Sequence, residues 1–514
     1  MRILIWHGWL LEGSGSNVYT ARVTELFRRQ GHDVLLLCQE PHPERYRFLD
    51  AWGAVGPGGV EDLQDLPADP APGRAVLLRP RIGRIIPVFV LDEYEAFEAK
   101  RFPDLSGEEL DAYLDANVAA LRHAAARHGS EMVVASHAIP GPVVARRALG
   151  DGTYVAKVHG SDLEYALREQ ERLVDLAREG LEGSRAVVGS SRDVLERTVR
   201  FVPTVRDRVM VVSPGVNVGR WRLRPRREAL LGAAEALDEA ADETSAGRSG
   251  SLDREVREAL DRRDGGALDA LARRYDQAVP DPDAAARLRR LADAGADAPV
   301  VGYLGKLIPQ KGVDVLLCSV ALLPERLRPQ VLVIGFGTFR EWLHALVAAL
   351  DAGDADAAAW LRDHSPMPVD LSDDEVAAGR GLAGRVTFTG RLDHRFAPEA
   401  VAALDVLVVP SVLEEAFGMV AAEGAAAGAL PLVARHSGLA EIAAGVEGAV
   451  GRPGHFSFEP GPGATRRIAE DLERLLSLPT EERDELRAQA SAFVGREWTW
   501  ERTAERLIAA HRGG

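Results

Sequence analysis

The chain has 514 residues, which is too many for one ordinary hydrophobic core and predicts two main domains. Its 62 basic and 78 acidic residues give a net charge of −16, which argues against duplex nucleic acid or an anionic membrane as a general partner. Two cysteines in apolar runs exclude a disulfide framework, and no leader or apolar run of the roughly 18 to 20 residues that a membrane span needs is present, so we expect a cytoplasmic protein.

Apolar runs alternate with helical patterns over residues 1–215, which predicts a doubly wound parallel sheet. The predicted strands of this first domain span residues 2–6, 33–38, 85–91, 132–136, 154–158, 186–189 and 209–212. After the first strand, the small residues of GSGSNVYT open a helix and would let the backbone approach a ligand closely. This stretch only half fits the dinucleotide-binding pattern, because Val18 stands where the third glycine is expected.

Residues 226–298 are rich in Ala, Arg, Asp, Glu and Leu, and their helical spacing is broken by AGRSGS and RDGG. We expect an inserted helical subdomain here, and a shorter Ala- and Asp-rich insertion at residues 345–384. Two accounts of these insertions stay open. They are surface decoration or a contact in a homo-oligomer, or they form a lid over an acceptor site.

A second series of apolar runs predicts strands at residues 300–304, 331–334, 386–389, 406–409 and 432–434. The simplest α/β architecture is therefore two Rossmann-like domains facing a cleft, an N-terminal one at residues 1–215 and a C-terminal one at residues 216–494. Ligands of such sheets bind beyond the carboxyl ends of the strands.

Lysine is rare in this chain, with four residues in all, and two of them, Lys306 and Lys311, fall within GYLGKLIPQKG. That segment joins a strand to a helix, so it places two compact cations at one turn. Point charges in this position suit a diphosphate, although two solvated lysines at a turn is the simpler alternative.

The segment at residues 410–442, PSVLEEAFGMVAAEGAAAGALPLVARHSGLAEI, places an acid and the start of a small apolar helix after a strand. Because the first N–H groups of a helix lack internal partners and carry the positive end of the dipole, this is a candidate anion site. Glu415 is predicted to lie in the loop facing a sugar, and Glu423 to lie in the helix and accept hydrogen bonds from ribose hydroxyls. A surface acid and a capping acid are the plainer readings.

This segment resembles the signature P-S-x-x-E-x-F-G…E…G-x-P of the retaining family-4 glycosyltransferases, also called glycosyl transferases group 1, which have the GT-B fold. The matching residues are Pro410, Ser411, Glu415, Phe417, Gly418, Glu423, Gly428, Pro431, Gly438 and Glu441. Ala416 departs from the usual proline, and Leu430 before Pro431 is also tolerated.

For the C-terminal domain, the resemblance implies that Lys306 and Lys311 clamp the donor diphosphate, with Lys306 standing where arginine is usual. It also implies that the helix at residues 495–514 packs back on the N-terminal domain. The donor-binding residues expected around Glu415 and elsewhere in this domain are Gly335, Gly337, Arg391, Leu392, Phe417, Gly418, Met419, Val420 and Glu423. Of these, Arg391 and Leu392 would hold the nucleotide base, mostly by backbone groups.

For the N-terminal domain, the resemblance implies that Gly13 and Gly15 lie under the donor phosphates and that Asn17 contacts the acceptor. His159, in KVHGSD, stands in the family's H-G-[ST]-D element and would lie against the reacting sugar. We leave Lys157 without a role. A single histidine at a strand end is otherwise more often structural.

Metal binding finds no support in the sequence. Its histidines form no H-E-x-x-H helix, and the D-x-D matches at residues 281–283 and 354–356 fall inside the insertions, where we treat them as chance. We expect no metal and no cofactor, since a nucleotide diphosphate sugar would be a substrate.

The predicted function is therefore a retaining, metal-independent glycosyltransferase acting through His159, Glu415, Lys306 and Lys311, with a nucleotide-sugar donor and a hydroxyl acceptor. Three alternatives stay open: a nucleotide-sugar epimerase on the same scaffold, a non-catalytic nucleotide-sugar-binding protein, and a dehydrogenase with Glu40 as its ribose acid. The donor sugar, base and acceptor are not specified by the sequence.

Overall fold

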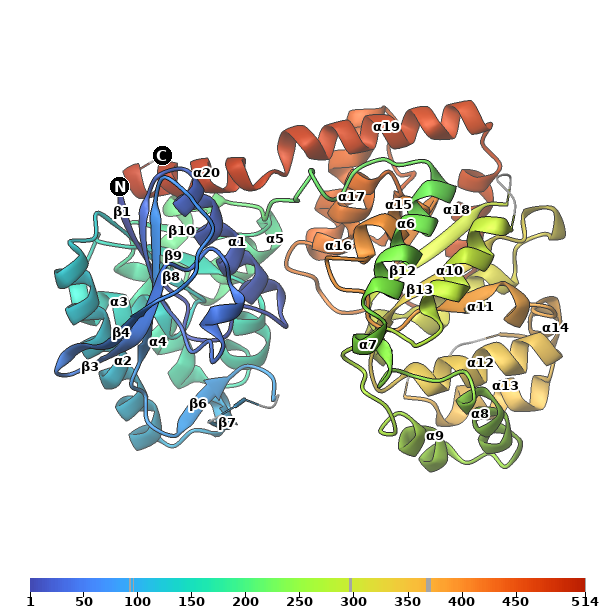
Figure 1. Cartoon of the computed structure of the whole chain (residues 1–514), viewed down its shortest axis with the longest axis horizontal. Coiled ribbons are helices and arrows are strands. Elements are labelled where there is room, and N and C mark those ends of the chain that lie inside the picture. Colours follow the sequence, from blue (N-terminus) through green and yellow to red (C-terminus); the bar gives the residue numbers. More distant parts are fainter. Residues whose placement is uncertain (92–93, 96, 295–297, 367–370, 514) are drawn as a thin grey trace. The chain divides into compact units, whose positions relative to one another are not determined.

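The computed structural model of the chain describes residues 1–91, 94–95, 97–294, 298–366 and 371–513 (Figure 1). The chain divides into two compact units. Unit 1 comprises Met1–Gly215 and Trp498–Gly514, and unit 2 comprises Val216–Glu497. Short parts of the two predicted insertions, residues 295–297 and 367–370, lie outside the described residues.

Unit 1 is built on one large sheet. Its strands are β1 (Arg2–Trp6), β2 (Asp33–Leu37), β3 (Ala51–Gly56), β4 (Gly59–Asp65), β5 (Arg74–Pro80), β8 (Met132–Ser136), β9 (Val155–Val158), β10 (Ala186–Gly189) and β11 (Val209–Val211). They lie in the order β11-β10-β9-β8-β1-β2-β5-β3-β4, and the pairs are parallel except for the β3–β4 hairpin. The central strands are near-continuous apolar runs because both faces of a parallel sheet are covered by helices. These helices are α1 (Gly15–Arg29), α2 (Gly107–His128), α3 (Gly141–Leu149), α4 (Glu171–Glu182), α5 (Arg192–Phe201) and α20 (Trp500–Arg512).

The strand predicted at residues 85–91 does not belong to the large sheet, so this prediction is wrong. Its first part forms β6 (Ile85–Val88), which pairs with β7 (Glu98–Arg101) in a separate two-stranded sheet. The position beside β2 is instead taken by β5, whose short AVLL run is buried. The prediction also missed β3 and β4, since β4 reads GVEDLQD and its residues are half-buried or exposed.

Helix α20 belongs to unit 1, where it packs against α1 and β10. Thr503 Oγ1 donates a hydrogen bond to the Ser213 carbonyl at 2.8 Å. Position 215 requires glycine, because a Cβ atom there would lie 2.1 Å from the backbone nitrogen of Trp500. The preceding helix, α19 (Thr480–Glu497), ends within unit 2.

Unit 2 is built on six parallel strands, β12 (Val300–Lys306), β13 (Gln330–Phe336), β14 (Val386–Phe388), β15 (Val406–Val409), β16 (Leu430–Ala434) and β17 (Ser457–Phe458). Their order is β14-β13-β12-β15-β16-β17. From β12 the chain moves first toward β14 and then to the other side at β15, so the strand order reverses between β12 and β15. Such a reversal is where open α/β sheets bind their ligands.

The larger insertion is helical, as its composition predicts, and forms part of unit 2. Its helices are α6 (Arg226–Glu239), α7 (Ala241–Thr244), α8 (Leu252–Asp261), α9 (Gly265–Leu271) and α10 (Ala284–Asp293). Helices α6 and α10 pack on each other, and α8 and α9 pack on α12 (Arg340–Ala352). The insertion is thus packed into unit 2.

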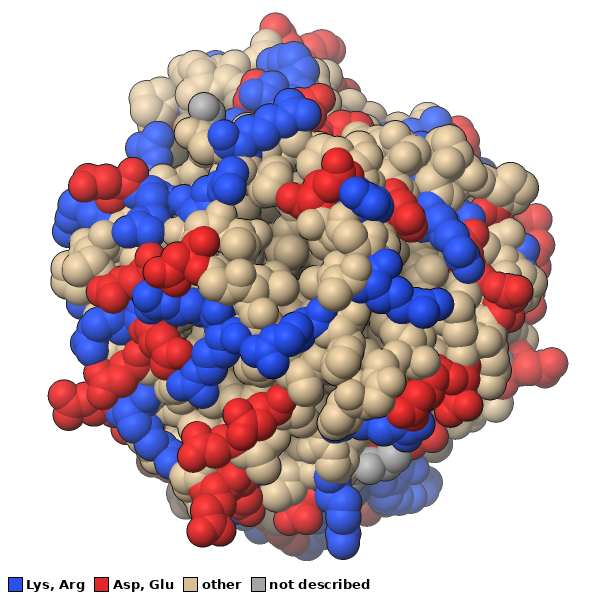
Figure 2. Space-filling view, turned by 90° about the vertical axis from the view of Figure 1, so that its left-hand side faces the viewer, with Lys and Arg blue, Asp and Glu red and all other residues tan. Residues whose placement is uncertain are grey.

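The other helices of unit 2 are α11 (Val313–Ala321), α13 (Ala355–His364), α14 (Asp373–Ala378), α15 (Ala397–Ala402), α16 (Met419–Ala427), α17 (Ser437–Val450) and α18 (Ala464–Leu476). None of the helices in the described part of the chain combines the length and apolar composition needed to cross a membrane. On the face shown in Figure 2, basic and acidic side chains are intermixed, so neither sign covers that face alone.

Candidate functional site

The predicted site residues of unit 2 lie at the carboxyl ends of strands or in the segments that follow them. Lys306 is the last residue of β12, Gly335 lies near the end of β13, Arg391 follows β14, and Glu415 follows β15. Because β12 and β15 are the strands at which the order reverses, the loops after them form the candidate ligand site of this sheet.

The structure brings Lys311 and Glu415 together, although 104 residues separate them. The Lys311 ammonium forms an ion pair with Glu415 Oε1, and each side chain is 24% exposed. The two loops touch closely, since a Cβ atom on Gly312 would lie 2.2 Å from the Pro410 carbonyl oxygen. Lys306 is exposed at the end of its strand. This edge of the unit 2 sheet therefore holds a partly exposed ion pair, and Lys306 adds a second cation at the end of β12.

The loop that carries Glu415 is held in place by the first turn of α17 (Ser437–Val450). Ser437 Oγ accepts a hydrogen bond from the Glu415 N–H at 2.9 Å, and the Gly438 N–H donates to the Glu415 carbonyl at 3.0 Å. Position 438 needs glycine, because a Cβ atom there would lie 2.5 Å from the Phe417 Cα. The backbone of Glu415 is thus held by the start of α17, in addition to the ion pair that its side chain forms with Lys311.

Helix α16 begins directly after this loop. Its N-cap is Gly418, which adopts a left-handed conformation with φ of 95° and has no side chain to accept a hydrogen bond from the first turn. Phe417 is buried, and Met419 and Val420 are half-buried. The uncapped amides provide partial positive charge beside Glu415 and Lys311, an arrangement suited to an anion. Glu423 lies one turn further along and is 7% exposed.

The glycines of the G-F-G turn at the end of β13 are explained by contacts within the chain. A Cβ atom on Gly335 would lie 2.1 Å from the Gly305 carbonyl oxygen, and one on Gly337 would lie 2.2 Å from the Leu307 carbonyl oxygen. The Gly335 N–H also donates to the Gly390 carbonyl at 3.0 Å. The turn is therefore joined to the loop that carries Arg391 and the buried Leu392.

In unit 1, the predicted residues lie around the start of α1. Gly13 has open space where a Cβ atom would be, whereas Gly15 begins α1 behind the N-cap Ser14, whose side chain accepts from the Asn17 N–H. The Asn17 side chain is also occupied, because its Oδ1 is 2.9 Å from His7 Nε2 and its Nδ2 donates to the Glu12 carbonyl. Asn17 thus orients a neighbouring ring.

His159 belongs to a cluster of three buried imidazoles that the sequence analysis missed. The ring centroids of His137 and His159 are 4.6 Å apart, and those of His7 and His137 are 5.9 Å apart. The three residues directly follow β8, β9 and β1, so a histidine after each of three apolar runs was the available signal. Within the described part of the chain, His159 Nε2 and both ring nitrogens of His137 have no hydrogen-bond partner.

Burial keeps these imidazoles neutral. It lowers the pKa of His7 to about 4 and the pKa values of His137 and His159 well below the usual value. Beneath them, Asp162 accepts hydrogen bonds from the backbone N–H groups of Ala138 and Gly160 at 2.5 and 2.7 Å. Among the described residues, no group of three or more histidine, cysteine, aspartate or glutamate side chains is arranged to hold a metal ion.

Lys157, for which the sequence suggested no role, is fully buried below this cluster. Its Nζ donates to Ser190 Oγ at 3.0 Å and lies 4.8 Å from the centroid of the Tyr19 ring. Burial lowers the pKa of Lys157 to about 7. Its contacts anchor neighbouring strands and helix α1.

Residues 366–477 match the family model described as glycosyl transferases group 1. Over 221 residues the chain is 32% identical to a D-inositol 3-phosphate glycosyltransferase of Stackebrandtia nassauensis, covering 42% of each chain. Over 204 residues it is 29% identical to a 2-deoxystreptamine glucosyltransferase of Streptomyces kanamyceticus, covering 39% of this chain and 40% of the relative. The chain thus spans about half or less of the length of the curated relatives it matches.

Two solved structures are similar over nearly the whole chain. Sucrose-phosphate synthase from Thermosynechococcus elongatus has a TM-score of 0.56 at 17% identity, and Anabaena HepE in complex with UDP and glucose has a TM-score of 0.56 at 13% identity. Each match covers 99% of this chain and 98% of the other. Together with the family match, these findings confirm the resemblance to group 1 glycosyl transferases and the GT-B fold.

Proposed function

We propose that this protein is a retaining, metal-independent glycosyltransferase that moves a sugar from a nucleotide diphosphate sugar to an acceptor hydroxyl. The observation that carries the proposal is the meeting of Lys311, Glu415 and the uncapped start of α16 at the point where the strand order of unit 2 reverses. A diphosphate needs cations and free amides, and a sugar needs an acceptor of hydroxyl hydrogen bonds, and this edge offers both.

The proposed chemistry is stabilisation of a leaving group. As the bond between the anomeric carbon and the diphosphate oxygen breaks, negative charge grows on the diphosphate, where Lys306, Lys311 and the α16 amides stabilise it. The acceptor oxygen then bonds to the same face of the sugar, and its proton passes to the departing phosphate. Glu415 holds sugar hydroxyls, and Glu423 is assigned to the ribose.

The Lys311–Glu415 ion pair gives this proposal a specific feature. Each partner is about one quarter exposed, so the pair is not sealed from solvent or ligand. A diphosphate that takes over the ammonium leaves the Glu415 carboxylate free to accept from the sugar. Donor binding thus exchanges one ion pair for two ligand contacts.

The remaining assignments are kept as parts of the same proposal. His159 is assigned to the reacting sugar. Its imidazole stays neutral near pH 7, which suits hydrogen bonding and packing more than proton transfer.

We assign no metal or cofactor. Two free, buried cysteines support a reducing compartment such as the cytoplasm.

The dehydrogenase alternative is disfavoured by the contacts of Glu40. Its carboxylate already accepts from the Leu11 N–H at 3.0 Å, the His42 N–H at 3.1 Å and the Tyr46 hydroxyl at 3.2 Å. An acid with these partners is poorly placed to bind a ribose. The epimerase and sensor alternatives are separated from transfer by product analysis with and without an acceptor.

The test begins with thermal-shift screening against nucleoside diphosphates and their sugars, because a bound donor raises the melting temperature by mass action. With the donor so identified, NMR of the product gives the anomeric configuration, and inversion contradicts the proposal. The rate should be unchanged by a chelator. Glu415→Ala should abolish turnover while the protein stays folded, and near-normal turnover would reject this assignment.

A further inference from the structure

The larger insertion contacts the loop after β14 through main-chain pairing. Pro280 pairs with Gly390 as an isolated antiparallel bridge, the Asp281 N–H donates to the Thr389 carbonyl at 2.8 Å, and the Arg391 N–H donates to the Val279 carbonyl at 3.4 Å. Gly390 has φ of 74°, and a Cβ atom there would lie 2.7 Å from Asp281 Oδ1. The inserted segment therefore lies directly against this loop.

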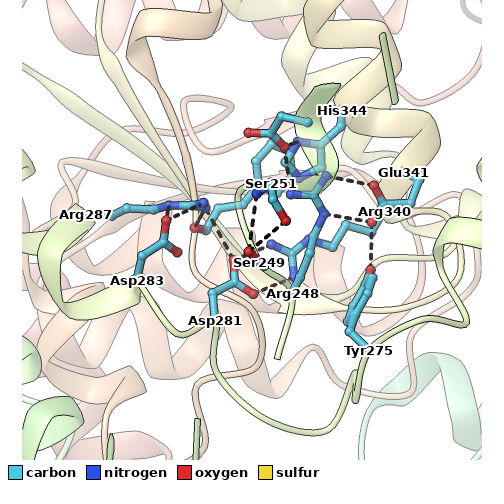
Figure 3. Close-up of polar contacts among 12 residues, drawn as sticks. Arg248, Ser249, Ser251, Tyr275, Asp281, Asp283, Arg287, Arg340, Glu341 and His344 are labelled. Atoms are coloured by element: carbon cyan, nitrogen blue, oxygen red, sulfur yellow. Dashed lines mark hydrogen bonds and ion pairs between the residues drawn. The ribbon is translucent and has the colours of Figure 1, made fainter. Parts of the chain in front are cut away.

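A buried ion-pair cluster fixes this contact (Figure 3). Both guanidinium NH2 groups of Arg340 donate to the Asp281 carboxylate, at 2.8 and 2.5 Å, and these two residues are 2% and 1% exposed. Arg287 joins the same carboxylate at 3.3 Å and donates to the Phe388 carbonyl at 2.7 Å. Because removing one member would leave a buried charge unpaired, this cluster ties the inserted segment to α12 and to the end of β14.

A second buried cluster in the insertion lies beside the first but holds a different part of it. Arg248 is fully buried and donates to both carboxylate oxygens of Glu341, at 2.8 and 2.9 Å, and the Tyr275 hydroxyl donates to Glu341 at 2.9 Å (Figure 3). None of these three contacts involves the loop after β14. The two clusters use adjacent residues of α12, so the second serves as a matched control for the first.

The loop after β14 is suited to a planar ring. The Arg391 guanidinium lies 5.2 Å from the centroid of the half-buried Phe336 ring, and its Nη1 donates to the Ala278 carbonyl of the inserted segment at 3.4 Å. Aromatic rings and guanidinium planes are the groups on which nucleic-acid bases stack. The insertion thus holds both the backbone and the side chain of Arg391.

We propose that the inserted segment at residues 278–281 positions the loop that receives the donor base, with Asp281 and Arg340 as positioning residues for base recognition. This inference rests on the proposed function. In this arrangement the diphosphate is bound by Lys306, Lys311 and the α16 amides, and the base is read by a loop whose shape the insertion sets. Selectivity among bases and affinity for diphosphate are then separable.

The test is calorimetric titration of the full chain with UDP, ADP, GDP and inorganic pyrophosphate. Asp281→Asn keeps the shape of the side chain but removes its charge. It should weaken the affinity for the preferred nucleoside diphosphate by about tenfold and reduce the differences in affinity among UDP, ADP and GDP. Its affinity for inorganic pyrophosphate should stay within about twofold of wild type, because pyrophosphate has no base. Arg287→Gln, at a partly exposed position, should act in the same direction and serves if Asp281→Asn does not fold.

Glu341→Gln is the control, since it removes one charge from the neighbouring cluster on the same helix. It should lower thermal stability and leave the ratio of nucleotide to pyrophosphate affinity unchanged. If the control shifts that ratio as much as Asp281→Asn does, the role is merely structural and the inference is wrong. If neither Asp281→Asn nor Arg287→Gln affects nucleotide binding, this inference is wrong but the proposed function stands. If the wild-type protein binds pyrophosphate but no nucleotide, the proposed donor is wrong as well.

Discussion

The carboxyl edges of the two parallel sheets carry opposite kinds of side chain. In unit 2, the edge presents the charged and partly exposed pair Lys311 and Glu415 beside the free amides of α16. In unit 1, the corresponding edge presents three buried histidines whose pKa values are lowered by burial. The same layout of strands and helices thus supports ionic contacts in one unit and uncharged contacts in the other.

Lys311→Ala removes the ion pair at the unit 2 edge and should have the largest effect on activity. We expect kcat/KM to fall by about 10² to 10³, the cost of removing one group that stabilises developing charge, with little change in the melting temperature. Lys100→Ala is the matched control, because Lys100 also pairs with a glutamate, Glu109 Oε2 at 2.7 Å, and is 32% exposed. Steady-state kinetics that show equal losses in both variants would contradict a special role for Lys311.

Gly438→Ala should disturb the same edge through the backbone. The new Cβ would meet Phe417 backbone atoms, so the loop that carries Glu415 must move, at a cost of about 1 to 3 kcal/mol in unfolding free energy. Nucleotide affinity should fall with it. Gly448→Ala on the same helix has no atom within 4 Å of its Cβ and should stabilise the protein slightly. Thermal unfolding and nucleotide titration of the two variants test the difference.

The buried histidines of unit 1 should make the stability of the protein depend on pH. The pKa of His7 is about 4 in the folded chain and lies near 6.5 when unfolded, so the unfolded chain gains the proton first as pH falls. Stability is therefore full above pH 6.5 and is lost toward pH 4, by about 2 kcal/mol from this residue between pH 6.5 and pH 5. Unfolding of wild type and His7→Gln across this range should show a shallower decline in the variant, and identical slopes would mean that His7 titrates normally.

The sequence predicts those features that rest on local patterns. Apolar runs located both series of central strands, and the rare lysines and the segment around Glu415 pointed to the loops that the structure places side by side. The Asp281–Arg340 pair could not be predicted, because its partners are 59 residues apart and a D-x-D match carries no information about a distant arginine. The D-x-D match at residues 281–283 is treated as chance because it falls inside the insertion. The polar edge strand β4 was missed because exposed strands lack an apolar run.

The chain passes between the two units twice, after Gly215 and again before Trp498. Helix α20, which completes unit 1, is therefore synthesised after all of unit 2. Domains commonly fold in order from the N-terminus as the chain emerges from the ribosome. In this protein the first unit must wait for its last helix, so nascent chains halted before Trp500 leave the surfaces of α1 and β10 that α20 covers without their partner.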